Sequence, residues 1–237
     1  MGIKEILKFL VIVSGMLAVL SSCTSNTNDK EELFDSSAVF HDYKISGEEG
    51  RDSVTVLLQY RYGNDEGSSM LLDSGSKVLL DGREIPADST RMSGVFYEVR
   101  LPIQEFRGAH TIVFTDKQGK EHRQEFSFLP FSLAAELPAQ IKKEPFIIRL
   151  NGFSSEATPM RLVMIDTAFN SRDVNEELMV KNGELTITMK MWKALKAGPI
   201  TMEIYREEEA PLKVGTNDKG RLIITYGIRR EFDAIEN

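Results

Sequence analysis

The chain has 237 residues, a single cysteine, and 29 Lys and Arg against 36 Asp and Glu, which gives a formal net charge of -7. This length allows one large domain or two ordinary ones. One cysteine excludes both an intrachain disulfide and a metal site built on several thiolates. The acidic balance argues against a dedicated nucleic-acid binder, which would carry a basic stripe.

Residues 1–22 have the pattern of an export signal. Lys4 and Lys8 precede an apolar run at residues 9–20, FLVIVSGMLAVL. A helix that spans a bilayer needs about 20 apolar residues, so this shorter run with a basic start indicates a secretory signal peptide. The alternative is an N-terminal membrane helix that remains in place.

The segment Leu20-Ser21-Ser22-Cys23 begins at the last residue of the apolar run and resembles the lipobox of bacterial lipoproteins. The resemblance implies cleavage before Cys23 and attachment of acyl chains such as palmitate to that residue. Several acyl chains would anchor the protein stably, because each buried methylene contributes about 0.8 kcal/mol. The alternative is a chance buried or free cysteine. The polar residues at 24–32 indicate that 23–33 is a flexible tether.

From Phe34 onward, apolar and polar residues alternate with period two, which indicates β-strands. Asp81-Gly82 and the segment 116–119 are typical of hairpin turns. Leu129-Pro130 divides the strands into two series, so we expect β-sandwich domains at 34–130 and 131–232 and a tail at 233–237. The expected strands are 53–62, the two short runs on either side of Asp81-Gly82 within 78–85, and then 95–101, 110–114, 121–128, 146–150, 160–165, 184–191, 200–205 and 221–232.

The two series resemble each other at an offset of 90 residues. Val95 and Gly108 then align with Leu185 and Gly198, so that each copy contains a strand, a short connection, a glycine and a strand. In an immunoglobulin-like sandwich this would be the crossover between strands E and F. The chain therefore resembles bacterial immunoglobulin-like or fibronectin-type-III-like modules in tandem, an all-β fold. It lacks the cysteine pair of antibody domains.

The sequence offers few residues for catalysis or for metal binding. It has three histidines, which we expect to be structural, and it lacks the Gly-x-Ser-x-Gly, Gly-x-x-x-x-Gly-Lys and Gly-x-Gly-x-x-Gly motifs. We therefore predict no catalytic residue, no metal site and no cofactor, with Cys23 as the lipid-attachment site. Candidates with a weaker basis are a calcium loop at Asp65, Glu66 and Asp73, and carboxylate pairs in loop-like stretches at 48–49, 65–66, 176–177 and 207–209.

Trp192 is the only tryptophan, and we expect it to plug the open end of the second sandwich, with a sugar-stacking or partner-contact role as the alternative. Tyr60 and Tyr62 share a strand face and are expected to pack across strands. Three segments resemble an O-glycosylation sequon of some anaerobic Gram-negative bacteria: 52–54, 88–90 and 166–168.

The predicted function is a lipid-anchored, non-enzymatic binding or scaffold module of the cell envelope, at the periplasmic or surface face of the outer membrane. Its partners would be the membrane, through the lipid, and a protein or a glycan. One alternative is a structural subunit of a fimbria-like or transport-accessory assembly, pairing through an exposed edge strand at 221–232. A hydrolase that uses a carboxylate pair is the third hypothesis.

Overall fold

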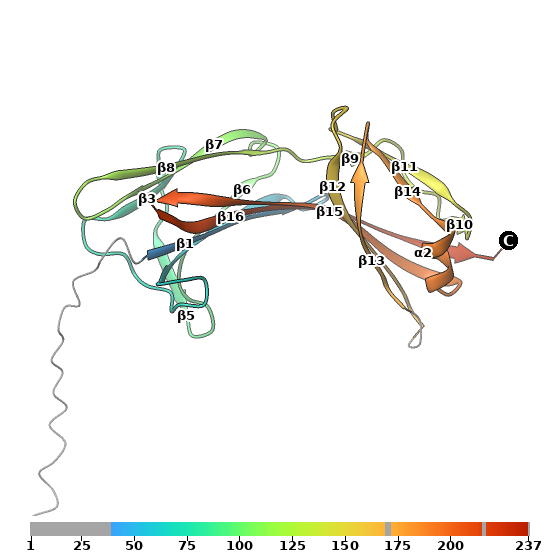
Figure 1. Ribbon diagram of the computed structural model, residues 1–237, viewed down its shortest axis with the longest axis horizontal. Helices are drawn as coiled ribbons and strands as arrows, with labels where there is room; N and C mark the ends of the chain where they lie inside the picture. Colours follow the sequence, from blue (N-terminus) through green and yellow to red (C-terminus); the bar gives the residue numbers. More distant parts are fainter. Residues whose placement is uncertain (1–38, 169–171, 215–216, 237) are drawn as a thin grey trace, which may run out of the picture. The chain divides into compact units, whose positions relative to one another are not determined.

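The computed structural model describes residues 39–168, 172–214 and 217–236 (Figure 1). The signal peptide, Cys23 and the tether lie outside these residues. The described part is built of β-strands with one short helix, as the alternating sequence predicts. No helix within it has the length and the apolar character needed to cross a bilayer.

The first half of the described chain forms two facing sheets. One contains β1, β2, β6 and β5 in spatial order, and the other contains β4, β3, β7 and β8. This is the arrangement of strands A-B-E-D against C′-C-F-G in an immunoglobulin-like sandwich. The strands are β1 (Val39–Glu48), β2 (Ser53–Tyr62), β3 (Lys77–Leu80), β4 (Arg83–Glu84), β5 (Ala87–Thr90), β6 (Gly94–Pro102), β7 (Gly108–Thr115) and β8 (Glu121–Phe128).

The second half repeats this arrangement with fewer strands in one sheet. A small sheet runs β14-β11-β9, and the facing strands run β13-β12-β15-β16, with β10 paired to β16. In immunoglobulin terms these are E-B-A against C′-C-F-G. The elements are β9 (Ser132–Leu133), β10 (Gln140–Lys142), β11 (Phe146–Asn151), β12 (Thr158–Asp166), β13 (Val174–Val180), β14 (Glu184–Ile187), α2 (Met189–Ala194), β15 (Gly198–Val214) and β16 (Asn217–Ile235).

Ring contacts show that each pair of sheets closes over its own core. In the first sandwich, Tyr60 and Phe114 from opposite sheets lie 5.1 Å apart, measured between ring centroids. In the second, Trp192 lies 6.1 Å from Phe146 and 6.3 Å from Phe232. Four of these rings are buried and that of Phe146 is partly buried, so aromatic packing stabilises both cores.

Both sandwiches contain the repeated crossover. The chain passes from one sheet to the other between β6 and β7, and again between β14 and β15. Gly108 and Gly198 stand at the same point of the two connections, with φ of 121° and 124°. L-residues with a side chain rarely adopt this conformation, so the shared glycine has a backbone reason.

The long hairpin of β15 and β16 joins the two halves. Strand β16 pairs with β15 on one side. On its other side it pairs in parallel with β1 from Gly220 to Gly227 and with β10 from Asp233 to Ile235. The last strand of the second sandwich thus also extends the sheet of the first. A Cβ added to Gly220 would lie 2.6 Å from the backbone oxygen of His41, so only glycine permits β16 to lie this close to β1.

The structure differs from the expectations for this last strand in two ways. It begins at Asn217 and continues to Ile235, into the segment 233–237 that was expected to be a tail. The expected strand 221–232 also has neighbours on both sides over most of its length, so it is not an exposed edge. Alternation identifies the buried face of a strand, but it does not identify the strand's neighbours.

Candidate binding groove

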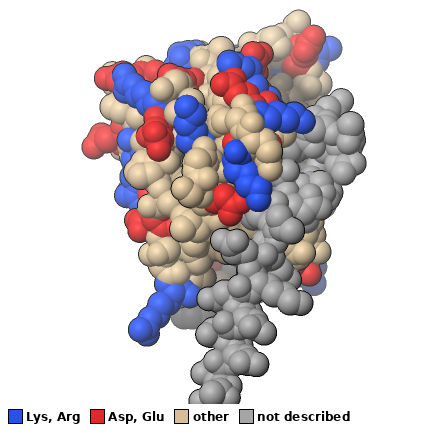
Figure 2. Space-filling view, turned by 90° about the vertical axis from the view of Figure 1, so that its left-hand side faces the viewer, with Lys and Arg blue, Asp and Glu red and all other residues tan. Residues whose placement is uncertain are grey.

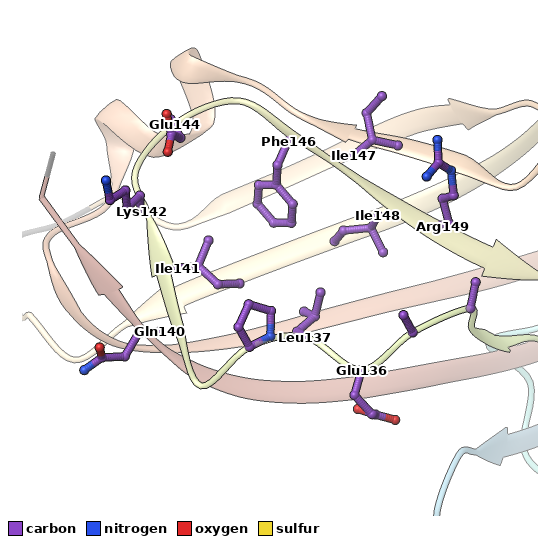
Figure 3. Close-up of a pocket in the computed structure, with 13 residues that line it drawn as sticks. Glu136, Leu137, Gln140, Ile141, Lys142, Glu144, Phe146, Ile147, Ile148 and Arg149 are labelled. Carbon is purple, nitrogen blue, oxygen red and sulfur yellow. The ribbon is translucent and has the colours of Figure 1, made fainter.

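A groove lies in the second sandwich, between the chain that leaves β9 and strand β11 (Figure 3). Its volume is about 650 Å³, and 13 residues between Ala134 and Arg149 line it. Leu137, Ile141, Phe146 and Ile148 point into the space, while Ile147 points away from it. The floor is therefore apolar.

The groove exists because the first strand of this sandwich changes sheets. Only Ser132 and Leu133 pair with β11, and Ala134 donates its N–H to Arg149 O at 2.8 Å. The chain then crosses to β16, where Ala139 O accepts from Asp233 N–H. Pro138 lies in the crossing segment, and Pro145 lies between β10 and β11. Proline has no N–H to donate to a neighbouring strand. These two prolines are therefore the sequence signal that could have revealed where the first strand of this sandwich is interrupted.

Strand β11 consequently presents unpaired backbone groups to the groove. Leu150 donates its N–H toward β14, to Gly183 O at 2.8 Å, whereas Arg149 O points the other way, to Ala134. Backbone groups alternate sides along a strand, so the N–H and C=O of Ile147 also point toward the side of the groove. In residues 39–168, 172–214 and 217–236, no strand pairs with Ile147 on that side.

The rim of the groove is charged and half of the charges are paired. Arg149 lies 3.4 Å from Glu184, and Glu136 lies 2.9 Å from Arg230. Lys142 and Glu144 are exposed at the other end. The rim therefore carries both signs.

Trp192 confirms the prediction of a plug. It lies in α2 with a fully buried side chain, and its Nε1–H donates to Glu144 O at 2.7 Å. Thr188 caps the helix through a hydrogen bond from Met191 N–H. Because the Trp192 ring is buried, a sugar cannot stack on it in this structure.

The three histidines are held by structural contacts. His41 is buried against Tyr43, and burial lowers its pKa to about 3. His110 contacts Asp81 at 2.7 Å, and His122 contacts Asp116 at 3.3 Å. His110 is opposite Phe126 and His122 is opposite Phe114, so the hairpin does not bring the two imidazoles together.

The suggested calcium ligands form ion pairs with different partners. Asp65 lies 3.4 Å from Arg221, and Asp73 lies 3.3 Å from Lys117. Glu66 is exposed. Among the described residues, no group of three or more His, Cys, Asp or Glu side chains is placed to hold a metal ion.

Two of the carboxylate pairs lie on strands instead of in loops. Glu176 and Glu177 belong to β13, and Glu207, Glu208 and Glu209 belong to β15. The outer side of β15 beyond Tyr205 has no strand partner in the described chain, since β12 ends its pairing there. Charged side chains followed by Pro211 are typical of an edge protected against further pairing.

The tyrosines and the sequon-like segments differ in their exposure. Tyr60 is buried as expected, whereas Tyr62, opposite Val39 on β1, is 60% exposed. In the sequon-like segments, Ser89 and Thr167 are exposed and Ser53 is partly exposed. Their modification remains a prediction, as does the lipid on Cys23, which lies outside the described residues.

No protein-family model matches the sequence, and the search of curated proteins finds no match. Among solved structures, the chain is similar to the crystal structure of DIP-gamma IG1+IG2, with 9% identity and a TM-score of 0.23 over 80% of this chain and 94% of that one. It is similarly matched to Dpr11 IG1 bound to DIP-gamma IG+IG2, with 9% identity and a TM-score of 0.23 over 82% and 96%. The immunoglobulin-like arrangement is identified by the strand order of the two sandwiches.

Proposed function

We propose that the protein is a lipid-anchored, non-enzymatic binding module of the cell envelope that receives an extended segment of a protein partner along β11. The anchor is supported by the lipobox pattern that ends at Cys23. The binding role is supported above all by the unpaired N–H and C=O of Ile147 beside an apolar groove.

A protein ligand suits this groove better than a glycan. An added strand forms main-chain hydrogen bonds with a free sheet edge, and its alternate side chains enter pockets. Here Leu137, Ile141, Phe146 and Ile148 would receive those apolar side chains. Glycan binding would be favoured by an exposed aromatic platform, and Trp192 is buried.

The structural-subunit alternative loses its original support. It depended on an exposed last strand, and β16 is paired with β15 on one side and, on the other, with β1 at 220–227 and with β10 at 233–235. The free edge at β11 is short and borders a groove, which fits recognition of a single segment better than sheet-to-sheet assembly.

Proline substitution provides a test that is specific for the backbone. Ile147→Pro removes the N–H that faces the groove and places a ring there, while the β14 ladder bonds made by Phe146 and Ile148 remain. Thr186→Pro is the matched control, because Thr186 lies opposite Ile147 and its N–H points to the outer side of β14.

Twelve-residue peptides selected from a displayed library against the purified mature chain are the probe. We expect them to bind the parent and Thr186→Pro alike, and to bind Ile147→Pro at least about tenfold more weakly, equivalent to about 1.4 kcal/mol. Trp192 fluorescence would verify that both variants remain folded. Equal binding to all three proteins, or a failure to select any peptide, would contradict the proposal.

A further inference from the structure

Three of the most exposed large apolar side chains lie in the first sandwich. Met92 is 99% exposed, Leu71 is 62% exposed and Tyr62 is 60% exposed. We refer to these three residues as the end patch. Scattered apolar residues are ordinary on a protein surface, but a contiguous group marks an interaction site.

Hydrogen bonds connect the three segments that carry the end patch. Tyr62 N–H donates to Ser68 O at 3.1 Å, next to Ser69. Val95 N–H donates to Ser69 Oγ at 2.8 Å, which ties the segment before Leu71 to the β5–β6 hairpin. Met92 lies in the turn of that hairpin, because Thr90 pairs with Gly94. The end of β2, the segment 68–71 and the hairpin turn are therefore neighbours.

The end patch lies where the described chain begins. Val39 is the first described residue, and it pairs directly with Tyr62. About 16 residues separate it from Cys23. A chain of this length reaches at most about 58 Å, whatever its conformation. A lipid on Cys23 therefore limits how far this end of the sandwich can lie from the bilayer.

The uncovered part of the face shown in Figure 2 does not carry one dominant charge. Figure 2, which faces the side of the molecule at the left of Figure 1, shows basic and acidic side chains interspersed with uncharged ones. Arg91 and Asp88 of the β5–β6 hairpin are both exposed. Attraction to a lipid surface would therefore come from apolar contact, and the salt-dependent attraction of a polybasic patch is not expected.

We propose that the end patch contacts the surface of the bilayer that holds the Cys23 lipid, with Met92 as the inserting tip and Tyr62 at the level of the headgroups. Tyrosine is enriched at membrane interfaces because its ring is apolar and its hydroxyl is polar. The inference rests on the lipid anchor of the proposed function. It adds a second, direct contact that would orient the first sandwich on the membrane.

Site-specific labelling tests the contact. Acylation would occupy Cys23, the only natural cysteine, so Met92→Cys gives one free thiol for an environment-sensitive fluorophore. Met179→Cys on β13 is the control, since Met179 is 61% exposed in the second sandwich. The lipidated full-length proteins are reconstituted into phosphatidylcholine vesicles that contain a spin-labelled lipid.

We expect the spin-labelled lipid to quench the label at position 92 at least about twofold more than the label at 179, with no loss of the difference at high salt. Incorporation of labelled palmitate into the parent, and not into Cys23→Ser, is measured separately. Palmitate incorporation with equal quenching at the two positions overturns the membrane contact alone. Absence of palmitate overturns both the contact and the anchor.

Discussion

His41 is a buried histidine whose ring has only part of its hydrogen-bonding capacity satisfied. Its Nδ1 lies 3.0 Å from the Tyr43 hydroxyl, which in turn lies 3.2 Å from the Tyr60 hydroxyl. Its Nε2 has no partner within the described part of the chain. Burial, and to a smaller extent the charge of His122, lowers the pKa of His41 to about 3. The folded protein therefore keeps this ring neutral.

This histidine should make stability depend on pH. Below about pH 6.5 the unfolded chain binds a proton at His41 that the folded chain does not bind. The free energy of unfolding therefore falls by about 1.4 kcal/mol for each unit by which the pH is lowered. We expect His41→Phe, which keeps an aromatic ring in the cluster, to remove this contribution. Urea unfolding followed by circular dichroism between about pH 6.5 and pH 4.5 measures the two slopes. Identical slopes in parent and variant would contradict the explanation.

At the scale of elements, an ion cluster fastens β16 to β1. Asp42 is 1% exposed, and its carboxylate lies 2.9 Å from Arg221 Nε and 3.2 Å from Lys44 Nζ. Burial alone would raise the pKa of Asp42, but hydrogen bonds from Arg221 and Lys44 outweigh it and lower the pKa. The cluster thus contributes stability above the ordinary aspartate pKa, and that stability is lost as the pH falls through the lowered value.

Removal of Arg221 should weaken this junction. Arg221→Ala leaves a buried carboxylate with fewer donors, so we expect a loss of about 1–3 kcal/mol in the free energy of unfolding. Arg229→Ala on the same strand is the control, because its ion pairs are half exposed and worth about 0–1 kcal/mol. Chemical denaturation of both variants at neutral pH makes the comparison. A loss at Arg221 no larger than at Arg229 would show that the cluster does not fasten the strands.

The elements also show how far the sequence could predict this fold. Alternation located many of the strands but not β1, β5, β9, β10 or β13. Asp81-Gly82 marked a hairpin that the structure confirms, with φ of 49° and 79° at its two residues. The repeated glycine predicted the crossover at Gly108 and Gly198. Pairing between β16 and β1 was not predictable, because the two strands lie almost 180 residues apart and both have apolar faces that fit many neighbours.

The candidate groove was missed for a related reason. Its essential feature is a missing neighbour for Ile147, and a sequence pattern describes side chains, not the hydrogen bonds of the backbone. Trp192 was predicted correctly as a plug, since adjacent apolar residues already indicated a buried position. The unpaired edge of β15 was harder to predict. Its run of glutamates at 207–209 has the composition of a loop, and only the pairing with β16 shows that it belongs to a strand.

For the whole molecule, the shared strand β16 should make the two sandwiches unfold together. It completes the sheet of the second sandwich and pairs with β1 of the first over eight residue pairs. Unfolding of either sandwich therefore removes hydrogen bonds from the other. Two-state behaviour would appear as coincident transitions from probes in the two halves.

Trp192 reports on the second sandwich alone, which makes the coupling measurable. Phe114→Leu creates a cavity in the first sandwich and should cost about 1–2 kcal/mol. If the sandwiches are coupled, this variant lowers the urea midpoint of the Trp192 fluorescence transition, although Phe114 belongs to the other core. Met92→Ala, a change at an exposed residue of the same sandwich, should leave the midpoint unchanged. A Trp192 transition that does not move in Phe114→Leu, while circular dichroism reveals a separate earlier step, would mean that the pairing of β16 with β1 is too weak to couple the two cores.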